Sequence, residues 1–125
     1  MKKSILFLFC LGGVAALEVA TITAFCGQVY RCGCSYSEGM TYCNVNSPSE
    51  PSCPWCSHGK SGFYMLFGLI LAGTALSICL AFTRFGPSLV PGLAAGLIGY
   101  LVWGFLVALA FALYDDYPLL KLWSG

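Results

Sequence analysis

Three long apolar segments alternate with polar segments along the chain. The apolar segments cover residues 4–25, 63–82 and 89–114, and a short turn at Gly86 and Pro87 separates the second from the third. A helix rises about 1.5 Å per residue, so about 20 residues extend about 30 Å, which is the thickness of a bilayer's hydrocarbon core. The pattern therefore predicts an all-α integral membrane protein with three transmembrane helices.

The polar segment between the first and second predicted helices shows neither a helical nor a strand-like apolar period. Residues 26–62 are rich in Gly, Ser, Pro and Cys, which predicts turns and a small irregular cysteine-rich loop module. We expect the first helix to be retained, like a signal anchor, because no small-x-small cleavage site follows it. The predicted parts are a first transmembrane helix at 1–25, the cysteine-rich module at 26–62, a transmembrane helical hairpin at 63–114 and an interfacial tail with Trp123 at 115–125.

Composition supports a membrane location and narrows the range of partners. Hydrophobic residues make up 58% of the chain and charged residues only 9%, whereas soluble domains average about 25% charged residues. A surface so poor in charge must be covered by lipid. The net charge of +1, without a basic run, excludes nucleic-acid binding, since that requires a basic stripe against the phosphates. We expect the lipid bilayer as the main partner, together with other membrane protein subunits or a second copy of the chain.

The orientation of the helices depends on two signals. The basic residues are balanced, with Lys2, Lys3 and Arg84 on one side of the predicted membrane and three others on the far side. Two lysines before the first apolar segment are typical of a segment whose N-terminus stays in the cytoplasm. Six cysteines in one loop suit an oxidising compartment. We therefore expect a cytoplasmic N-terminus, with the cysteine-rich module and the C-terminus outside the cytoplasm.

Six of the eight cysteines fall in the module, and the first interpretation is that they form three structural disulfides. A module of this size cannot bury a hydrophobic core of its own, and a disulfide that closes such a loop stabilises it by about 3 kcal/mol. Spacing in the sequence does not decide which cysteines pair. The expected disulfide residues are Cys26, Cys32, Cys34, Cys43, Cys53 and Cys56.

A metal site is the second interpretation of the same cysteines. Cys32, Cys34, Cys53 and Cys56, with His58 two residues further on, are spaced as ligands for zinc or iron. The Cys-Pro-x-Cys turn resembles the metal-binding turns of zinc ribbons and rubredoxins over these four residues alone. This interpretation becomes the stronger one if the module lies in the cytoplasm, where thiols stay reduced.

Thiol–disulfide exchange at Cys53 and Cys56 is the third interpretation. A redox C-x-x-C motif places its first thiol at a helix N-terminus, where the helix dipole lowers the thiol pKa. Ser52 is a suitable cap for such a helix, but Gly59 and Gly62 limit its length, and no preceding strand supplies a thioredoxin-like frame.

Two features of the predicted spans suggest contacts between helices. Glu18 is an acid inside the first span, where a charge is costly, and Tyr100 or Trp103 lies at a suitable depth to donate a hydrogen bond to it. Alternatives for Glu18 are a proton or metal relay and a polar contact with another subunit. Small residues four apart on the third span permit close packing of helices. These residues are Gly92, Ala95, Gly96 and Gly99.

The small-residue helix faces, the lone acid and a rigid module together suit docking. We therefore expect a structural or accessory subunit of a larger membrane assembly, without a cofactor. A zinc- or iron-binding membrane protein and a membrane thiol–disulfide oxidoreductase are the alternatives. We do not expect an enzyme, because serine hydrolase, phosphate-loop and dinucleotide motifs are absent and His58 is the single histidine.

Overall fold

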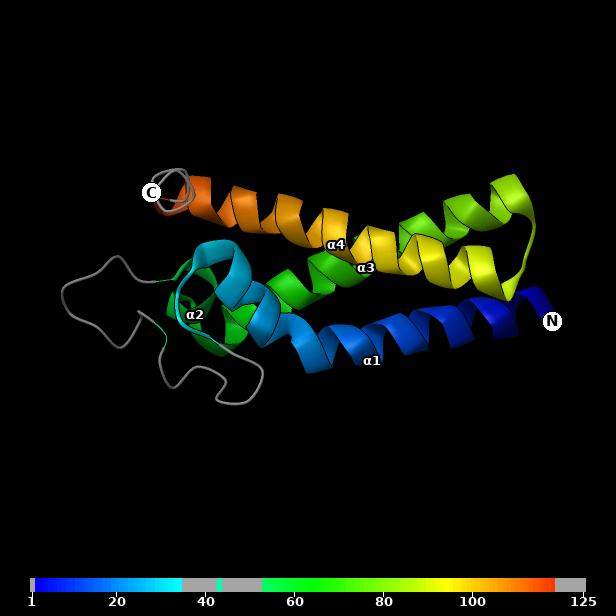
Figure 1. Ribbon diagram of the computed structural model, residues 1–125, viewed down its shortest axis with the longest axis horizontal. Helices are drawn as coiled ribbons and strands as arrows, with labels where there is room; N and C mark the ends of the chain where they lie inside the picture. The colour runs from blue at the N-terminus through cyan, green and yellow to red at the C-terminus, as the bar shows by residue number, and fades with distance from the viewer. Residues whose placement is uncertain (1, 35–42, 44–52, 119–125) are drawn as a thin grey trace. The chain divides into compact units, whose positions relative to one another are not determined.

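The protein is almost entirely helical in the residues that the computed structural model describes, which are 2–34, 43 and 53–118. No strand occurs among these residues. The interfacial tail predicted around Trp123 falls mostly in residues 119–125, outside the described set. The helices in chain order are α1 (Lys2–Tyr30), α2 (Pro54–Ser57), α3 (Gly59–Phe85) and α4 (Leu89–Tyr114) (Figure 1).

Three of these helices are long and apolar enough to cross a membrane. They are α1 and α4 over their full lengths and α3 from Tyr64 to Phe85. Large apolar side chains such as Leu8, Leu80 and Val90 are exposed on them, which suits helix surfaces that face lipid. The prediction of an all-helical fold with three apolar helices of spanning length is confirmed.

The first helix is longer than the apolar segment that predicted it. α1 continues past residue 25 to Tyr30, because residues 26–30 contain no proline and both Val29 and Tyr30 are buried. Arg31 then takes a left-handed conformation, with φ 50°, which ends the helix. As a result, the first cysteine of the module lies on a helix rather than in a loop.

Both α3 and α4 end in left-handed caps. Gly86, with φ 81°, donates its N–H to the carbonyl of Phe82 at 3.0 Å and closes α3. Asp116, with φ 52°, occupies the corresponding position after α4, where the N–H of Tyr117 bonds to the carbonyl of Ala112 at 2.8 Å. The first cap makes the turn into α4, and the second fixes the direction in which Tyr117 leaves its helix.

The described helices contribute to two compact units, and each long helix takes part in both. In the first unit, Cys10, Ile78 and Phe82 form a buried apolar core, and the rings of Phe7 and Phe82 meet edge to face with centroids 6.4 Å apart. Since the three core residues come from α1 and α3, this core joins those two helices. The first unit contains Met1–Val19 and Phe67–Gly104, and the second contains Ala20–Leu66 and Phe105–Gly125.

Glycines on α4 allow close approach between helices in the first unit. A β-carbon at Gly92 would lie 2.8 Å from the sulfur of Cys10, and one at Gly96 would lie 2.8 Å from Val14. The same β-carbon at Gly96 would lie 3.3 Å from Ile78 on α3. These positions have no room for a side chain, so glycine is what lets α1 and α3 contact α4.

Two further small-residue contacts join α3 to α4. A β-carbon at Gly99 would overlap the side chain of Ser77, and one at Gly73 would overlap the ring of Trp103. Ala95 is half-buried. Three of the four small residues predicted to pack therefore contact side chains of this chain's own helices.

Glu18 is fully buried in the first unit, and neither carboxylate oxygen has a hydrogen-bond partner among the described residues. Tyr100 is buried in the same unit, and Trp103 packs over Gly73. The structure therefore places neither of these two side chains as a donor to the carboxyl. A part for Glu18 in a relay or in a subunit contact stays a prediction.

The close contact at Gly96 predicts a loss of stability on substitution. Gly96→Ala should destabilise the first unit by about 1–3 kcal/mol, because the added methyl group forces Val14 and Ile78 to shift. Gly68→Ala is the matched control, since a β-carbon there meets no atom within 4 Å. The measurement is the thermal midpoint of purified protein in detergent, and equal midpoints for the two variants would contradict the close packing.

Candidate metal centre

All six cysteines of the module meet in the second unit. Five of them are buried and Cys56 is half-buried. The other two cysteines, Cys10 and Cys79, belong to the first unit and take no part in this group. The six that meet are Cys26 near the end of α1, Cys32 and Cys34 in the segment after it, Cys43, Cys53 just before α2 and Cys56 within α2.

The six sulfurs include four groups of three in which any two groups share one sulfur, and we call these groups the triads. Within each triad, all three sulfur atoms lie within 4.8 Å of one another. Such groups have the donor type and spacing to hold a thiophilic metal ion. The triads are Cys26, Cys32 and Cys53; Cys26, Cys34 and Cys56; Cys32, Cys34 and Cys43; and Cys43, Cys53 and Cys56.

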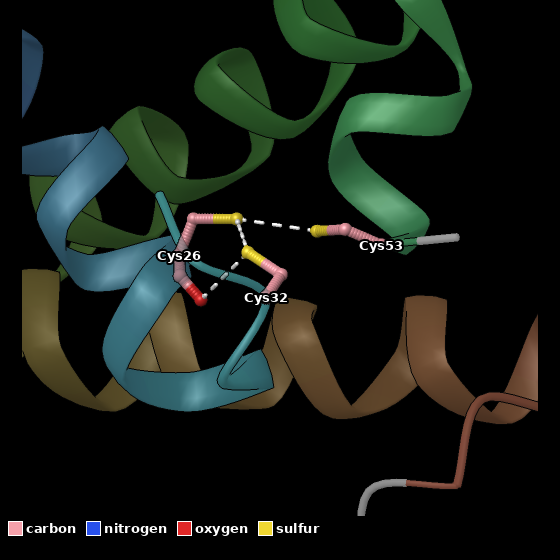
Figure 2. A group of neighbouring side chains, drawn as sticks. All are labelled: Cys26, Cys32 and Cys53. Atoms are coloured by element: carbon pink, nitrogen blue, oxygen red, sulfur yellow. Dashed lines mark hydrogen bonds between the residues drawn. The ribbon is translucent and has the colours of Figure 1, made fainter. Parts of the chain in front are cut away.

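The sulfur atoms in the cluster lie close together, but farther apart than the two sulfurs of a disulfide bond. The sulfur of Cys26 lies 3.3 Å from that of Cys53 and 3.6 Å from that of Cys32 (Figure 2). Cys34 and Cys56 are also 3.6 Å apart. A disulfide bond measures about 2.05 Å. No pair of described cysteines lies at that bonding distance, so the three disulfides expected from the sequence are not formed in this structure.

A sharp reversal after α1 brings the first three cysteines together. Arg31 and Gly33 both have positive φ, 50° and 95°, so the chain turns back along the helix it has just left. A β-carbon at Gly27 would overlap the backbone carbonyl of Cys34. The missing side chain at Gly27 therefore allows Cys34 to return to the level of Cys26.

The other pair of cysteines is held by one short helical turn. Pro54 stands at the first position of α2, and the N–H of Ser57 bonds to the carbonyl of Cys53 at 2.9 Å. This turn brings the sulfurs of Cys53 and Cys56 into one triad with Cys43. The sequence motif Cys-Pro-Trp-Cys thus presents two sulfurs to the same group.

Aromatic rings join the two segments that carry the cysteines. Trp55 of α2 stacks on Phe25 of α1, with ring centroids 5.9 Å apart, and meets Tyr30 edge to face at 5.2 Å. Tyr30 is fully buried and Trp55 nearly so. These contacts fix the position of α2 against the end of α1. They therefore hold the sulfurs of Cys53 and Cys56 close to the sulfur of Cys26.

Two tyrosine hydroxyls tie the end of α1 to the end of α4. Tyr30 donates its hydroxyl proton to the carbonyl of Ala108 at 2.6 Å. Tyr117 donates to the carbonyl of Tyr30 at 2.8 Å, and the two tyrosine rings meet edge to face at 5.4 Å. The second bond satisfies a carbonyl that the helix end would otherwise leave without a partner.

His58 lies apart from the sulfurs. Its Nε2 atom lies 2.8 Å from a carboxylate oxygen of Asp115, and its ring meets Phe111 edge to face at 5.7 Å. It shares no triad with any described cysteine. The four cysteines of the predicted metal set all belong to the cluster, but no triad consists of them alone, because each triad also contains Cys26 or Cys43.

Hydrogen bonding between sulfurs affects thiol ionisation in the segment after α1. Hydrogen bonds with Cys26 and, to a smaller extent, with Cys53 hold the pKa of Cys32 well below its ordinary value. A hydrogen bond with Cys26 also lowers the pKa of Cys34, against the opposing effect of burial. The thiolate is the form of cysteine that binds metal ions.

Several residues that position the cysteines were not assigned this part from the sequence. They are Gly27, Tyr30, Trp55 and Tyr117. Gly27 directly follows Cys26, and a glycine at that position could have indicated that another part of the backbone approaches closely there. The two tyrosine hydrogen bonds join residues 78 and 87 positions apart, so no local pattern could have shown them.

Comparisons with known proteins leave the site to be interpreted from its own geometry. No protein-family model matches the chain, and no curated protein and no solved structure is significantly similar to it.

The reversal at Gly27 gives a testable expectation. Gly27→Ala should push Cys34 away from Cys26 and open the cluster, so thiols of the reduced protein should react at least about tenfold faster with maleimide. Labelling is followed by intact mass. Gly12→Ala on the same helix is the control, since its β-carbon meets nothing within 4 Å. Unchanged labelling in Gly27→Ala would rule out the close approach.

Proposed function

We propose that this chain is a small integral membrane protein that binds thiophilic metal ions through the six cysteines of its second unit. The four triads are the observation that carries the proposal. Thiolates select soft or borderline ions such as Zn²⁺, iron and Cu⁺. Burial of five of the six sulfurs favours a site that retains its metal, because water and competing ligands have limited access.

Metal binding explains the cysteine cluster, whereas docking in a larger assembly loses the features on which it was based. The docking expectation depended on small-residue helix faces available to a partner. Gly92, Gly96 and Gly99 instead contact side chains of the same chain. Glu18 is also buried within the chain itself. These features stabilise the helices internally, and they leave the cysteine cluster as the feature that calls for a function.

Metal binding is also favoured over thiol–disulfide exchange. A catalytic thiol must be reached by its substrate, yet Cys53 has no exposed surface. α2 has four residues, so the first thiol lacks the long helix that lowers the pKa of redox cysteines. The sulfurs of Cys53 and Cys56 are members of a wider cluster and do not form an isolated pair.

The proposal predicts bound metal that depends on the cluster. Wild-type protein purified without oxygen should carry thiophilic metal, measured by plasma mass spectrometry on the sample used for intact mass. Cys32→Ser should lower metal affinity by at least about tenfold, since it removes a direct ligand. Cys79→Ser should keep the wild-type content, because Cys79 is an exposed cysteine outside the triads.

One result would remove the proposal. If the wild type carries no metal, takes up none when reduced, and has a mass lowered by two hydrogens for each of three disulfides, the cysteines are structural crosslinks. Equal metal content in wild type and Cys32→Ser would also place the metal elsewhere.

We further propose that the N-terminus is cytoplasmic and that the cysteine cluster faces the extracytoplasmic side. Lys2 and Lys3, directly before the apolar part of α1, support this orientation. With three spans, the turn between α3 and α4 then lies in the cytoplasm.

Labelling tests this orientation. Phe85→Cys places a thiol at an exposed position beside that turn. An impermeant maleimide should leave it unlabelled in intact cells and label it after the membrane is opened. Labelling of intact cells would reverse the orientation without affecting the metal proposal.

A further inference from the structure

The triads share their members in a regular way. Each sulfur belongs to two triads, and any two triads have one sulfur in common. Cys43, for example, joins the triad of Cys32 and Cys34 to the triad of Cys53 and Cys56. The same pair distances close four further groups of three, such as Cys26, Cys32 and Cys34, so the six sulfurs lie at the corners of an octahedron and the four triads are its alternate faces. Ions in two faces that share an edge would be only about 1.9 Å apart with metal–sulfur bonds of about 2.3 Å, so at most four alternate faces can be filled together.

Three pairs of cysteines share no triad, so their sulfurs lie on opposite sides of the cluster. Any choice of four cysteines includes at least one pair that shares no triad, and the described sulfurs form no group of four within 4.8 Å. A tetrahedral four-thiolate zinc site needs four sulfurs all about 3.8 Å apart, given a bond of about 2.3 Å. The sulfurs therefore do not match one closed zinc site. The separated pairs are Cys26 with Cys43, Cys32 with Cys56 and Cys34 with Cys53.

Three-coordinate ions match the triads. An ion in the plane of three sulfurs, at about 2.3 Å from each, places those sulfurs about 4.0 Å apart. The triads are bounded by 4.8 Å, and their measured pairs lie at 3.3 and 3.6 Å. Cu(I) is the thiophilic ion that suits this geometry, because it is soft and carries a single charge, so three thiolates satisfy it, whereas the doubly charged Zn(II) takes four ligands.

We propose that the six cysteines hold four Cu(I) ions, one in each triad, with every thiolate bridging two ions. This inference rests on the metal-binding function proposed above and adds the identity, number and arrangement of the ions. Six thiols and four Cu⁺ ions give a cluster of net charge −2 and six released protons. No electron is transferred, because the copper enters as Cu(I).

Bridging explains how six thiolates are accommodated in a buried site. Six unpaired thiolates would carry six negative charges away from water, which is prohibitively costly. Four monovalent cations leave two of these charges, and each sulfur contacts two cations. A single ion in one triad would leave the other three thiols without a metal. The tetranuclear cluster uses all six ligands that the fold brings together.

The coordination also indicates what kind of site this is. Each copper ion takes all three of its ligands from the protein, so no position is left open for a substrate. Closed metal sites serve structure or storage, whereas catalytic sites keep an open position. The cluster therefore suits storage or buffering of Cu(I) at the membrane.

A titration with Cu(I) tests the inference. Metal-free, reduced full-length protein in detergent is titrated without oxygen, and native mass spectrometry counts bound ions. Wild type and the control Cys79→Ser should fill to four ions per chain. Cys56→Ser removes two triads and leaves two complete, so it should fill to two. X-ray absorption should show three sulfurs per copper and copper–copper scattering at about 2.7 Å, the distance set by this geometry with bonds of about 2.3 Å.

The other outcomes separate this inference from the function on which it rests. Saturation of the wild type at one copper ion, or tight binding of one Zn(II) ion in preference to copper, overturns the tetranuclear cluster and leaves metal binding in place. Failure to bind either ion overturns both. If Cys56→Ser does not fold, the X-ray absorption spectrum of the copper-loaded wild type tests the tetranuclear cluster by itself. A spectrum without copper–copper scattering overturns the cluster.

Discussion

The reversal of the chain directly after α1 is the constraint on which the cysteine site depends. Cys26 is fixed on the helix, so Cys32 and Cys34, which follow within eight residues, can reach it only if the backbone returns along the same helix. The left-handed conformations of Arg31 and Gly33 make that return, and the absence of a side chain at Gly27 lets the carbonyl of Cys34 lie against the helix. A larger residue at Gly27 would keep these sulfurs apart whatever their number.

The second requirement is a rigid support, because six sulfurs at these distances must be held within a few tenths of an ångström. The aromatic contacts of Trp55 with Phe25 and Tyr30 fix α2 against α1, and the hydroxyls of Tyr30 and Tyr117 fix the end of α1 against the end of α4. Both hydroxyl bonds reach backbone carbonyls, so they fix the course of the chain directly. The site is therefore preorganised by the spans more than by the module that contains the cysteines.

The sequence predicted the helices because long apolar segments of spanning length leave few alternatives. It did not predict that α1 would continue to Tyr30, since Cys-Gly-Gln has the composition of a loop and the burial of Val29 and Tyr30 depends on distant residues. We expected disulfides because the module was predicted to lie in an oxidising compartment, and the sequence alone carries no information on the distances between the sulfurs. Local spacing correctly grouped Cys32 with Cys34 and Cys53 with Cys56. It included His58 only through nearness in the sequence, whereas the chain directs that ring to Asp115.

The two units obtain their stability from different sources. The first unit relies on close contact between helices at Gly92 and Gly96, as helices in lipid do when water no longer drives their association. The segment that carries most of the cysteines has little apolar surface to bury, and chains of that length need a crosslink or a metal. The proposed cluster would supply that crosslink through many bonds at once, and its binding free energy would become folding free energy for the module. The helices would then remain folded in the metal-free state, and the metal would add stability to the sulfur positions that the helices already favour.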